Sequence, residues 1–275
     1  MPPEATVGVW RVQAGDDSAV LKVVAQVEAE DSRWPAAPEP EHPYYWRREP
    51  LVYESGLLGR LAAGLRAPRC RAVVERADGS VALWLEDVPP SPPWSVDQLA
   101  GLAHCVGVTQ AGFAADLPSH EWIGRGWLRE YLRLHDAPDP ELEAVLARLE
   151  AAQQTFSHLD LHPGNVLGGE ASVVIDWAHC GVAPLGSDPG VLVADGVADE
   201  VLAPELADDA TREVLSAYLA GLRDAGWRGR DEDVSYVFLR GTALRLSWLP
   251  RGDRPSWDAT HALLDRWREQ ARELA

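Results

Sequence analysis

The sequence predicts a two-lobed α+β fold, with a small β-rich lobe over residues 1–88, a proline-rich hinge over 89–95 and a larger helical lobe over 96–275. Short runs of β-branched and other apolar residues, separated by turn residues, dominate the first lobe. Consecutive prolines then interrupt the chain, and apolar residues beyond them recur at helical spacing. A chain of 275 residues is long enough to build a core for both lobes.

The small lobe is predicted to begin with a hairpin and a helix. Val7–Val12 and Ala19–Val24 are strand-type runs, and Gln13–Asp17 between them contains the turn residues Gly and Asp. Apolar residues then recur at helical spacing over Tyr45–Leu65, which predicts a helix there.

A second hairpin and a linker complete this lobe. Arg71–Arg76 and Ser80–Glu86 are strand-type runs on either side of Asp78-Gly79, a dipeptide that favours a tight turn. Pro89–Pro93 is the clearest linker, because consecutive prolines continue neither a strand nor a helix.

The remainder of the chain is predicted to be mainly helical. The predicted helices cover residues 96–111, 127–134, 140–153, 209–225, 231–249 and 257–274. A compact β-loop-β segment interrupts this series between the third and fourth helices, and it carries the most polar part of the lobe.

Composition and charge exclude several classes of protein. The formal net charge of −18 repels phosphate backbones, so we expect no nucleic-acid partner; the same charge suits a cationic substrate or solubility alone. No apolar run approaches the length of a membrane span, and Met1–Ala5 lacks the pattern of a secretory signal, so we expect no membrane association and a cytoplasmic location. Cys70, Cys105 and Cys180 form no CxxC pair, which argues against a zinc site and a disulfide framework.

The β-loop-β segment gathers the residues suited to chemistry. Asp160 starts a tightly turned loop, Asn165 follows five residues later, and Asp176 ends the apolar run Val173–Ile175. One carboxylate for a proton, with an Asn and a second Asp as oxygen ligands for a hard cation, is the set that phosphoryl transfer requires. The alternative is that these residues are turn formers and a strand terminator.

The spacing resembles a known family. His158-x-Asp160-x-x-x-x-Asn165, followed by Ile175-Asp176-Trp177, is similar to the catalytic loop and metal-binding segment of the aminoglycoside phosphotransferase family, in the protein-kinase-like superfamily. The resemblance implies a protein-kinase-like fold, Asp160 as catalytic base toward a substrate hydroxyl, and Asn165 and Asp176 as Mg²⁺ ligands. We expect His158 to brace the loop.

The resemblance extends to the nucleotide side. Lys22, in the middle of an apolar strand, resembles the lysine that contacts nucleotide phosphates, and a buried lysine needs an anionic partner. Glu49 resembles the helix glutamate that pairs with this lysine, with Glu54 as the alternative. The backbone of Glu86 and Val88 resembles the segment that hydrogen-bonds adenine.

One departure from the family pattern concerns the residues before Lys22. In the family, a strand, a nucleotide-covering turn and a second strand precede the lysine, whereas Val7–Val12 supplies one strand here and Gly8 is the only glycine before that strand ends. We therefore expect an apparently shortened lobe, or a chain start that lies downstream of the true one.

The resemblance also includes a residue after the β-loop-β segment. Asp188 resembles the buried aspartate that supports the catalytic loop in the family.

The resulting functional hypothesis is an ATP-dependent phosphotransferase, with GTP as the alternative donor and Mg²⁺ as cofactor, acting on a hydroxyl of a small molecule. An aminoglycoside or another amine-bearing compound is the favoured acceptor, since the C-terminal region is acidic. The acids concerned are Asp208, Asp209, Glu213, Asp224, Asp231, Glu232 and Asp233. Tryptophans such as Trp122, Trp127, Trp227 and Trp248 are packing residues or stacking surfaces for a ligand. The alternative function is a non-catalytic nucleotide-binding protein of the same fold.

Overall fold

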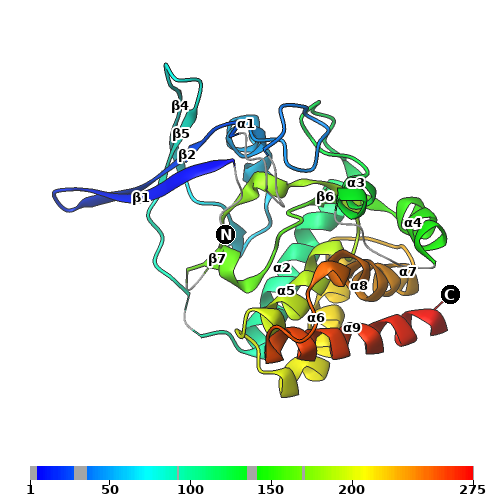
Figure 1. Ribbon diagram of the computed structural model, residues 1–275. Coiled ribbons are helices and arrows are strands. Elements are labelled where there is room, and N and C mark those ends of the chain that lie inside the picture. Colours follow the sequence, from blue (N-terminus) through cyan, green and yellow to red (C-terminus); the bar gives the residue numbers. More distant parts are fainter. Residues whose placement is uncertain (1–4, 28–35, 92, 135–140, 169–170, 275) are drawn as a thin grey trace.

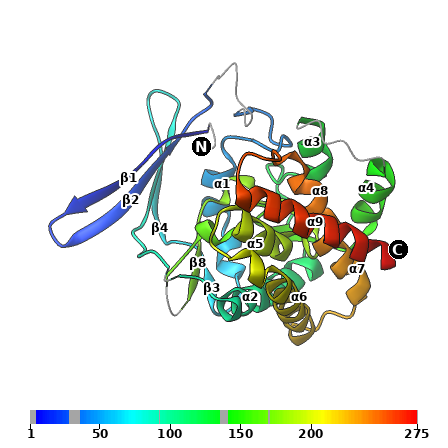
Figure 2. The same ribbon diagram turned by 60° about the horizontal axis from the view of Figure 1, so that its bottom comes forward.

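The computed structural model describes residues 5–27, 36–91, 93–134, 141–168 and 171–274. Strands gather on one side of the molecule and helices on the other, and in both views the hairpin of β1 (Thr6–Ala14) and β2 (Asp17–Val24) extends away from the helices (Figures 1 and 2). The predicted α+β architecture, with a small β-rich lobe and a larger helical lobe, is confirmed.

The small lobe is built on one antiparallel sheet. Its strands, in spatial order, are β1 (Thr6–Ala14), β2 (Asp17–Val24), β5 (Val81–Glu86) and β4 (Cys70–Glu75). Both predicted hairpins form. The first turns through Gly15 and the second through Gly79, and both glycines have the positive φ that such tight turns require (63° and 81°). Lys22 lies on β2, opposite Leu83 of β5.

The helix predicted over Tyr45–Leu65 is wrong in its length. Helix α1 covers Arg48–Ser55 and ends at Gly56, which adopts a left-handed conformation with φ 78° and therefore stops the helix. A short 3₁₀ turn over Leu57–Arg60 follows, and then β3 (Leu65–Arg66), which pairs in parallel with a strand of the other lobe. This part of the chain thus ties the two lobes together.

The predicted linker connects β5 to the first helix of the second lobe; Pro92 lies outside the described residues. Ser95 caps that helix, because its Oγ accepts a hydrogen bond from the Gln98 N–H (3.2 Å) while the Gln98 side chain accepts one from the Ser95 N–H (2.9 Å). The linker is also held to the loop region of the second lobe, since Ser91 Oγ donates to the Val166 carbonyl (2.9 Å).

Most helices of the second lobe lie where the sequence predicts them. They are α2 (Val96–Ala115), α3 (Trp127–Leu134), α4 (Leu142–Ala151), α5 (Ser187–Ala198), α6 (Ala207–Asp224), α7 (Asp231–Tyr236), α8 (Thr242–Arg245) and α9 (Pro255–Glu273). Residue 140, where the third predicted helix begins, lies outside the described residues. Helices α2 and α6 pack backbone to backbone, because a Cβ at Gly107 would come within 2.3 Å of the Tyr218 carbonyl oxygen.

Two parts of this lobe differ from the prediction. The helix predicted over residues 231–249 is present through Trp248, but it is not one regular α-helix, since a π-helical turn at Val237–Gly241 separates α7 from α8 and a 3₁₀ turn at Leu246–Trp248 ends the segment. The sequence did not predict helix α5, whose buried face packs against α9 and α6. Among the helices that the structure describes, none combines the length and apolar character that a membrane crossing requires.

Short strands frame the polar segment between α4 and α5. They are β6 (Gln154–Ser157), β7 (Val166–Leu167), β8 (Ser172–Val174) and β9 (Gly181–Pro184). Strand β6 pairs with β9, while β8 lies between β7 and β3. The loops after β6 and β8 meet, since the His158 ring contacts the Ile175 carbonyl (2.9 Å), and the loop after β8 reaches the small lobe where Asp176 contacts Lys22 (2.9 Å).

Candidate active site

The loop after β6 rests on a buried hydrogen-bond network centred on Asp188. The two carboxylate oxygens of Asp188 accept from the backbone N–H groups of His158 and Leu159, both at 2.8 Å. Gln110 donates to the same carboxylate (2.8 Å) and accepts from the Tyr218 hydroxyl (2.5 Å). These bonds hold Leu159 at a positive φ of 64°, a conformation that non-glycine residues adopt at an energetic cost. Asp188 thus supports the loop, as its position in the sequence suggested.

His158 links this loop to the segment that carries Asp176. Its Nδ1 accepts from the Asp160 N–H (3.2 Å), so the proton resides on Nε2, which donates to the Ile175 carbonyl (2.9 Å). Burial lowers the pKa of His158 and keeps the ring neutral. A neutral ring that bonds backbone groups at both nitrogens is a brace, in line with the expectation from sequence.

Two side chains, those of Asn165 and Arg245, orient the Asp160 carboxylate. Asn165 Nδ2 donates to the Asp160 carbonyl (2.9 Å) and to its Oδ2 (3.1 Å), and Arg245 Nη2 lies 3.0 Å from Oδ1. Arg245 also donates to the Leu159 carbonyl. Burial opposes ionisation of Asp160, but the nearby His179 and Arg245 side chains outweigh it and hold the pKa of Asp160 below its usual value. The carboxylate is therefore ionised at neutral pH and fixed in direction.

Lys22 of the small lobe reaches both Glu49 and Asp176. Its Nζ lies 2.6 Å from Glu49 Oε2 and 2.9 Å from Asp176 Oδ1, and both Lys22 and Glu49 are buried. Glu54, the alternative partner, is exposed. Burial opposes the charge on Asp176, yet Lys22 outweighs it and lowers the pKa of Asp176 to about 2. The buried lysine thus has the anionic partners that the sequence required, from α1 and from the end of β8.

The oxygen atoms near Asp176 suit a divalent cation shared with phosphate. Asn165 uses its amide N–H groups toward Asp160, which leaves its carbonyl oxygen for another partner, and Lys22 engages only one Asp176 oxygen. In the part of the chain that the structure describes, no three His, Cys, Asp or Glu residues form a metal cluster. Mg²⁺ commonly takes one or two protein oxygens together with substrate phosphates, so the donor set fits that ion.

Glu86 and Val88 lie at the junction of the lobes, apart from these groups. Arg66 holds the Glu86 carboxylate (2.7 Å) and lowers its pKa, and the Glu86 N–H donates to the Arg69 carbonyl (2.9 Å). Val88 is buried. Neither residue lines the cavity that contains Asp160, so the structure does not bring them into contact with the acidic groups.

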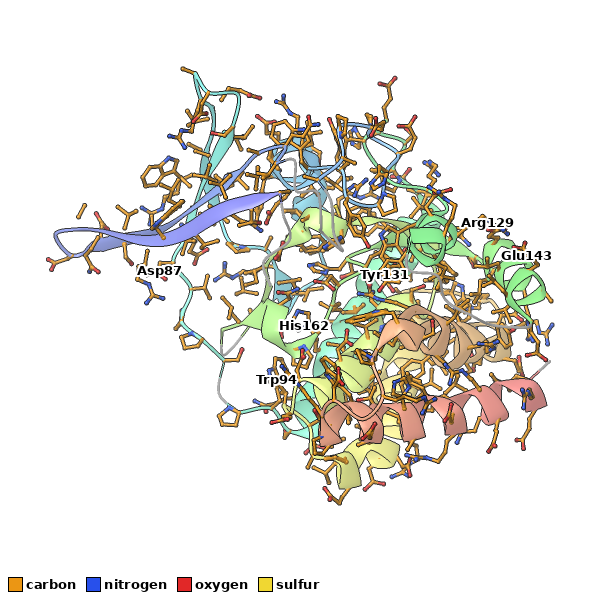
Figure 3. All side chains as sticks on the ribbon, in the orientation of Figure 1. Asp87, Trp94, Arg129, Tyr131, Glu143 and His162 are labelled. Atoms are coloured by element: carbon orange, nitrogen blue, oxygen red, sulfur yellow. The ribbon has the colours of Figure 1, made fainter. Side chains whose placement is uncertain are left out.

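A cavity of about 330 Å³ opens beside Asp160. Tyr131 and His162, labelled in Figure 3, lie on its walls. Its other aromatic walls are Tyr44, Trp127, His179 and Trp248, and its acids are Asp160, Asp176 and Asp195. The acidic residues of α6 and α7 do not line it: Asp208 and Asp209, for example, pair with Arg266 and Arg212 on the surface, both at 2.8 Å. The expected acidic lining therefore exists, but different residues provide it.

The sequence did not point to two charged residues of this cavity. Arg245 comes from α8 and Asp195 from α5, and neither belongs to a motif or a local spacing that marks a site. Burial raises the pKa of Asp195 to about 6, with Arg245 and His162 acting against that rise. The only signal in the sequence was a lone arginine inside the apolar run Leu244–Leu246.

Comparison with known proteins agrees with this geometry. Residues 5–232 match the model of the phosphotransferase enzyme family (APH). The amicoumacin kinase hAmiN, solved with AMP-PNP, Ca²⁺ and Ami, has a similar fold, with a TM-score of 0.59 and 15% identity over 99% of this chain and 89% of that one. Choline kinase LicA from Streptococcus pneumoniae gives a TM-score of 0.50 and 12% identity over 97% and 89%. No curated protein sequence matches the chain. Because the family match spans most of its length, the chain belongs to the phosphotransferase enzyme family, with the protein-kinase-like fold.

Proposed function

We propose that the protein transfers the γ-phosphoryl group of ATP to a hydroxyl group of a small molecule. One observation carries the proposal: Lys22 and Glu49 of the small lobe converge with Asp176 at the same place where Asp160 and Asn165 of the large lobe meet. Membership of a phosphotransferase family supports the reaction class. GTP is the alternative donor. No observation favours the non-catalytic alternative.

In this reaction Asp160 binds the acceptor hydroxyl and takes its proton. Asn165 and Arg245 each engage one carboxylate oxygen of Asp160, so the orientation of the carboxylate is set before substrate arrives. Its low pKa makes it a weak base, and we therefore assign it mainly to aligning the hydroxyl, with proton transfer late in the step.

The nucleotide is held from the small lobe. Lys22 would contact its phosphates, with Glu49 keeping the ammonium in place, and Asn165 and Asp176 would hold Mg²⁺. When bound, that ion neutralises charge on the phosphate oxygens. The Glu86 N–H already donates to the Arg69 carbonyl, so we assign the Val88 N–H as the hydrogen-bond donor to adenine.

The acceptor pocket favours an amine. Asp195 lines the cavity, and Asp199 lies 3.4 Å from the cavity residue His162, so carboxylates border the site beyond Asp160. Aromatic faces such as those of Tyr44 and Trp248 are suited to a neighbouring cation. We therefore propose an amine-bearing acceptor, for example an aminoglycoside.

We also propose that the chain divides into a small lobe over residues 1–88, a hinge over 89–95 and a large lobe over 96–275. We propose a cytoplasmic location, where ATP is available.

The test is phosphate transfer from labelled ATP or GTP to a panel of aminoglycosides, choline-like amines, sugars and homoserine. The wild type should show Mg²⁺-dependent transfer to at least one amine-bearing acceptor. Asp160→Asn should abolish it and retain nucleotide binding, whereas Asp253→Asn, an exposed aspartate, should be fully active. Nucleotide binding without transfer or hydrolysis in the wild type would instead support the non-catalytic alternative.

A further inference from the structure

A second cavity, of about 260 Å³, lies in the helical lobe between α3, α4, β9 and the π-helical turn. Its walls are mainly apolar and include Leu146, Leu149, Val182 and Val237, all of them buried side chains. Apolar side chains that face empty space forgo packing contacts, and cavities of this kind take up apolar molecules in preference to water. The cavity thus suits an aromatic ring or a short alkyl group.

The second cavity adjoins the catalytic one. Trp127, Leu159 and Arg245 line both cavities. The Arg245 guanidinium lies 5.2 Å from the centre of the Trp127 ring on one side and 3.0 Å from Asp160 Oδ1 on the other. A molecule that presents a hydroxyl to Asp160 therefore needs only a short connection past Trp127 to enter the second cavity.

Two polar groups at this junction point to a ligand. Trp127 Nε1 and Arg245 Nε are buried N–H groups without an acceptor among the described residues. Buried N–H groups in proteins are nearly always hydrogen-bonded, so two such donors in side chains shared by both cavities favour a ligand oxygen here. The outer end of the second cavity differs, because Arg129 and Glu150 on its wall pair with each other (2.9 Å). Arg129 also pairs with Glu143 between α3 and α4, as Figure 3 illustrates.

We infer that the acceptor is amphipathic: it presents a hydroxyl and an amine in the catalytic cavity, an oxygen at the junction of Trp127 and Arg245, and an aromatic or short alkyl group in the second cavity. The inference rests on the proposed function, because it names the class of molecule that the kinase phosphorylates. It goes beyond that function in predicting selection for an apolar substituent remote from the reacting hydroxyl.

Gly241 offers a way to fill the second cavity alone. It lines the cavity with helical backbone, and a Cβ there would meet Leu149 Cδ2 at 3.6 Å and Val237 Cγ1 at 3.7 Å, which are ordinary contacts. Gly241→Leu should therefore occupy the space without touching Asp160. Gly101→Leu is the matched control, since Gly101 is an exposed residue of α2 with nothing within 4 Å of a Cβ.

Two probe molecules isolate the apolar group. 1-Amino-3-methoxypropan-2-ol and 1-amino-3-(benzyloxy)propan-2-ol share the hydroxyl, the amine and the ether oxygen, and differ by a phenyl ring. With Mg²⁺ and ATP, we expect the wild type to favour the benzyl ether by at least about tenfold in kcat/KM, and to bind it more tightly by calorimetry without nucleotide. Gly241→Leu should reduce both preferences to within about threefold, and Gly101→Leu should retain them.

Each outcome is decisive. Phosphorylation of both probes without preference, or a preference that survives Gly241→Leu, would overturn the inference and leave the proposed function standing. Failure of the wild type to bind the benzyl ether more tightly would also overturn it. Tight binding that Gly241→Leu removes, without any phosphate transfer, would support the cavity assignment and count against the proposed function. If thermal melting shows that the Leu variant is unfolded, Gly241→Ala should give a smaller change in the same direction.

Discussion

Replacement of Arg245 tests how Asp160, the proposed catalytic base, is positioned. Arg245 bonds the Asp160 carboxylate at 3.0 Å and the Leu159 carbonyl, and its side chain is 11% exposed, so water does not readily substitute for it. Arg245→Gln removes the charge and keeps much of the volume. A hydrogen bond between charged groups contributes about 1.5–3 kcal/mol, so we expect kcat to fall by about 10- to 100-fold.

The pH profile should change in a defined direction. Arg245 helps to hold the pKa of Asp160 below its usual value, so the carboxylate stays ionised, and the activity it supports is lost only as pH falls through that low pKa. Without Arg245 the pKa rises, and the acid limb of kcat must move to higher pH. Arg245→Lys keeps the charge but not the two-pronged contact, and it should lower kcat while leaving the acid limb near its wild-type position.

The assay is steady-state phosphate transfer from ATP between pH 4.5 and 9, for the wild type and both variants. The KM for ATP is an internal control. We assign nucleotide binding to the Lys22–Glu49 ion pair, which does not include Arg245, so this KM should be unchanged. An Arg245→Gln enzyme with wild-type kcat and an unmoved acid limb would show that Arg245 does not position Asp160. A rise in the KM for ATP alone would place Arg245 in nucleotide binding instead.

Three further predictions concern the rest of the site. Lys22→Met should lower kcat/KM for ATP by about 100-fold. It should also lower the melting temperature, because Glu49 is left buried beside Asp176 without a cation. Unchanged values of both quantities would exclude the role assigned to Lys22. Asp188→Ala should lower the free energy of unfolding in urea by about 2–4 kcal/mol, because the His158 and Leu159 N–H groups lose their hydrogen-bond acceptors. A loss below about 0.5 kcal/mol would show that this hydrogen-bond network does not stabilise the loop. Removal of divalent cations with EDTA should abolish transfer and leave the far-ultraviolet circular dichroism intact, with activity restored by Mg²⁺; transfer that persists in EDTA would refute the metal assignment.

Much of the fold was readable from local patterns. Both hairpins of the small lobe follow from strand-type runs around turn glycines, and these glycines have the positive φ that the turns require. The helix predicted over residues 127–134 begins at Trp127, as predicted. The helix predicted over residues 45–65 was too long, because apolar spacing continues past Gly56, where α1 ends. The helix predicted over residues 231–249 is present, but apolar spacing did not reveal the π-helical turn within it.

The motif at Asp160, Asn165 and Asp176 could be recognised without a structure, because the groups lie within one loop and the strand pair next to it, and their spacing alone brings them together. The choice of Glu49 over Glu54 as the partner of Lys22 could not be made from the sequence, since it depends on which face of α1 is turned toward β2. Arg245 lay further from any local pattern, 85 residues along the chain from Asp160. Contacts of that kind arise from the packing of whole helices, and so do the second cavity and the burial that shifts the pKa of Asp195. Short-range spacing therefore specified the proposed reacting groups, whereas long-range packing selected their partners and shaped the cavities beside them.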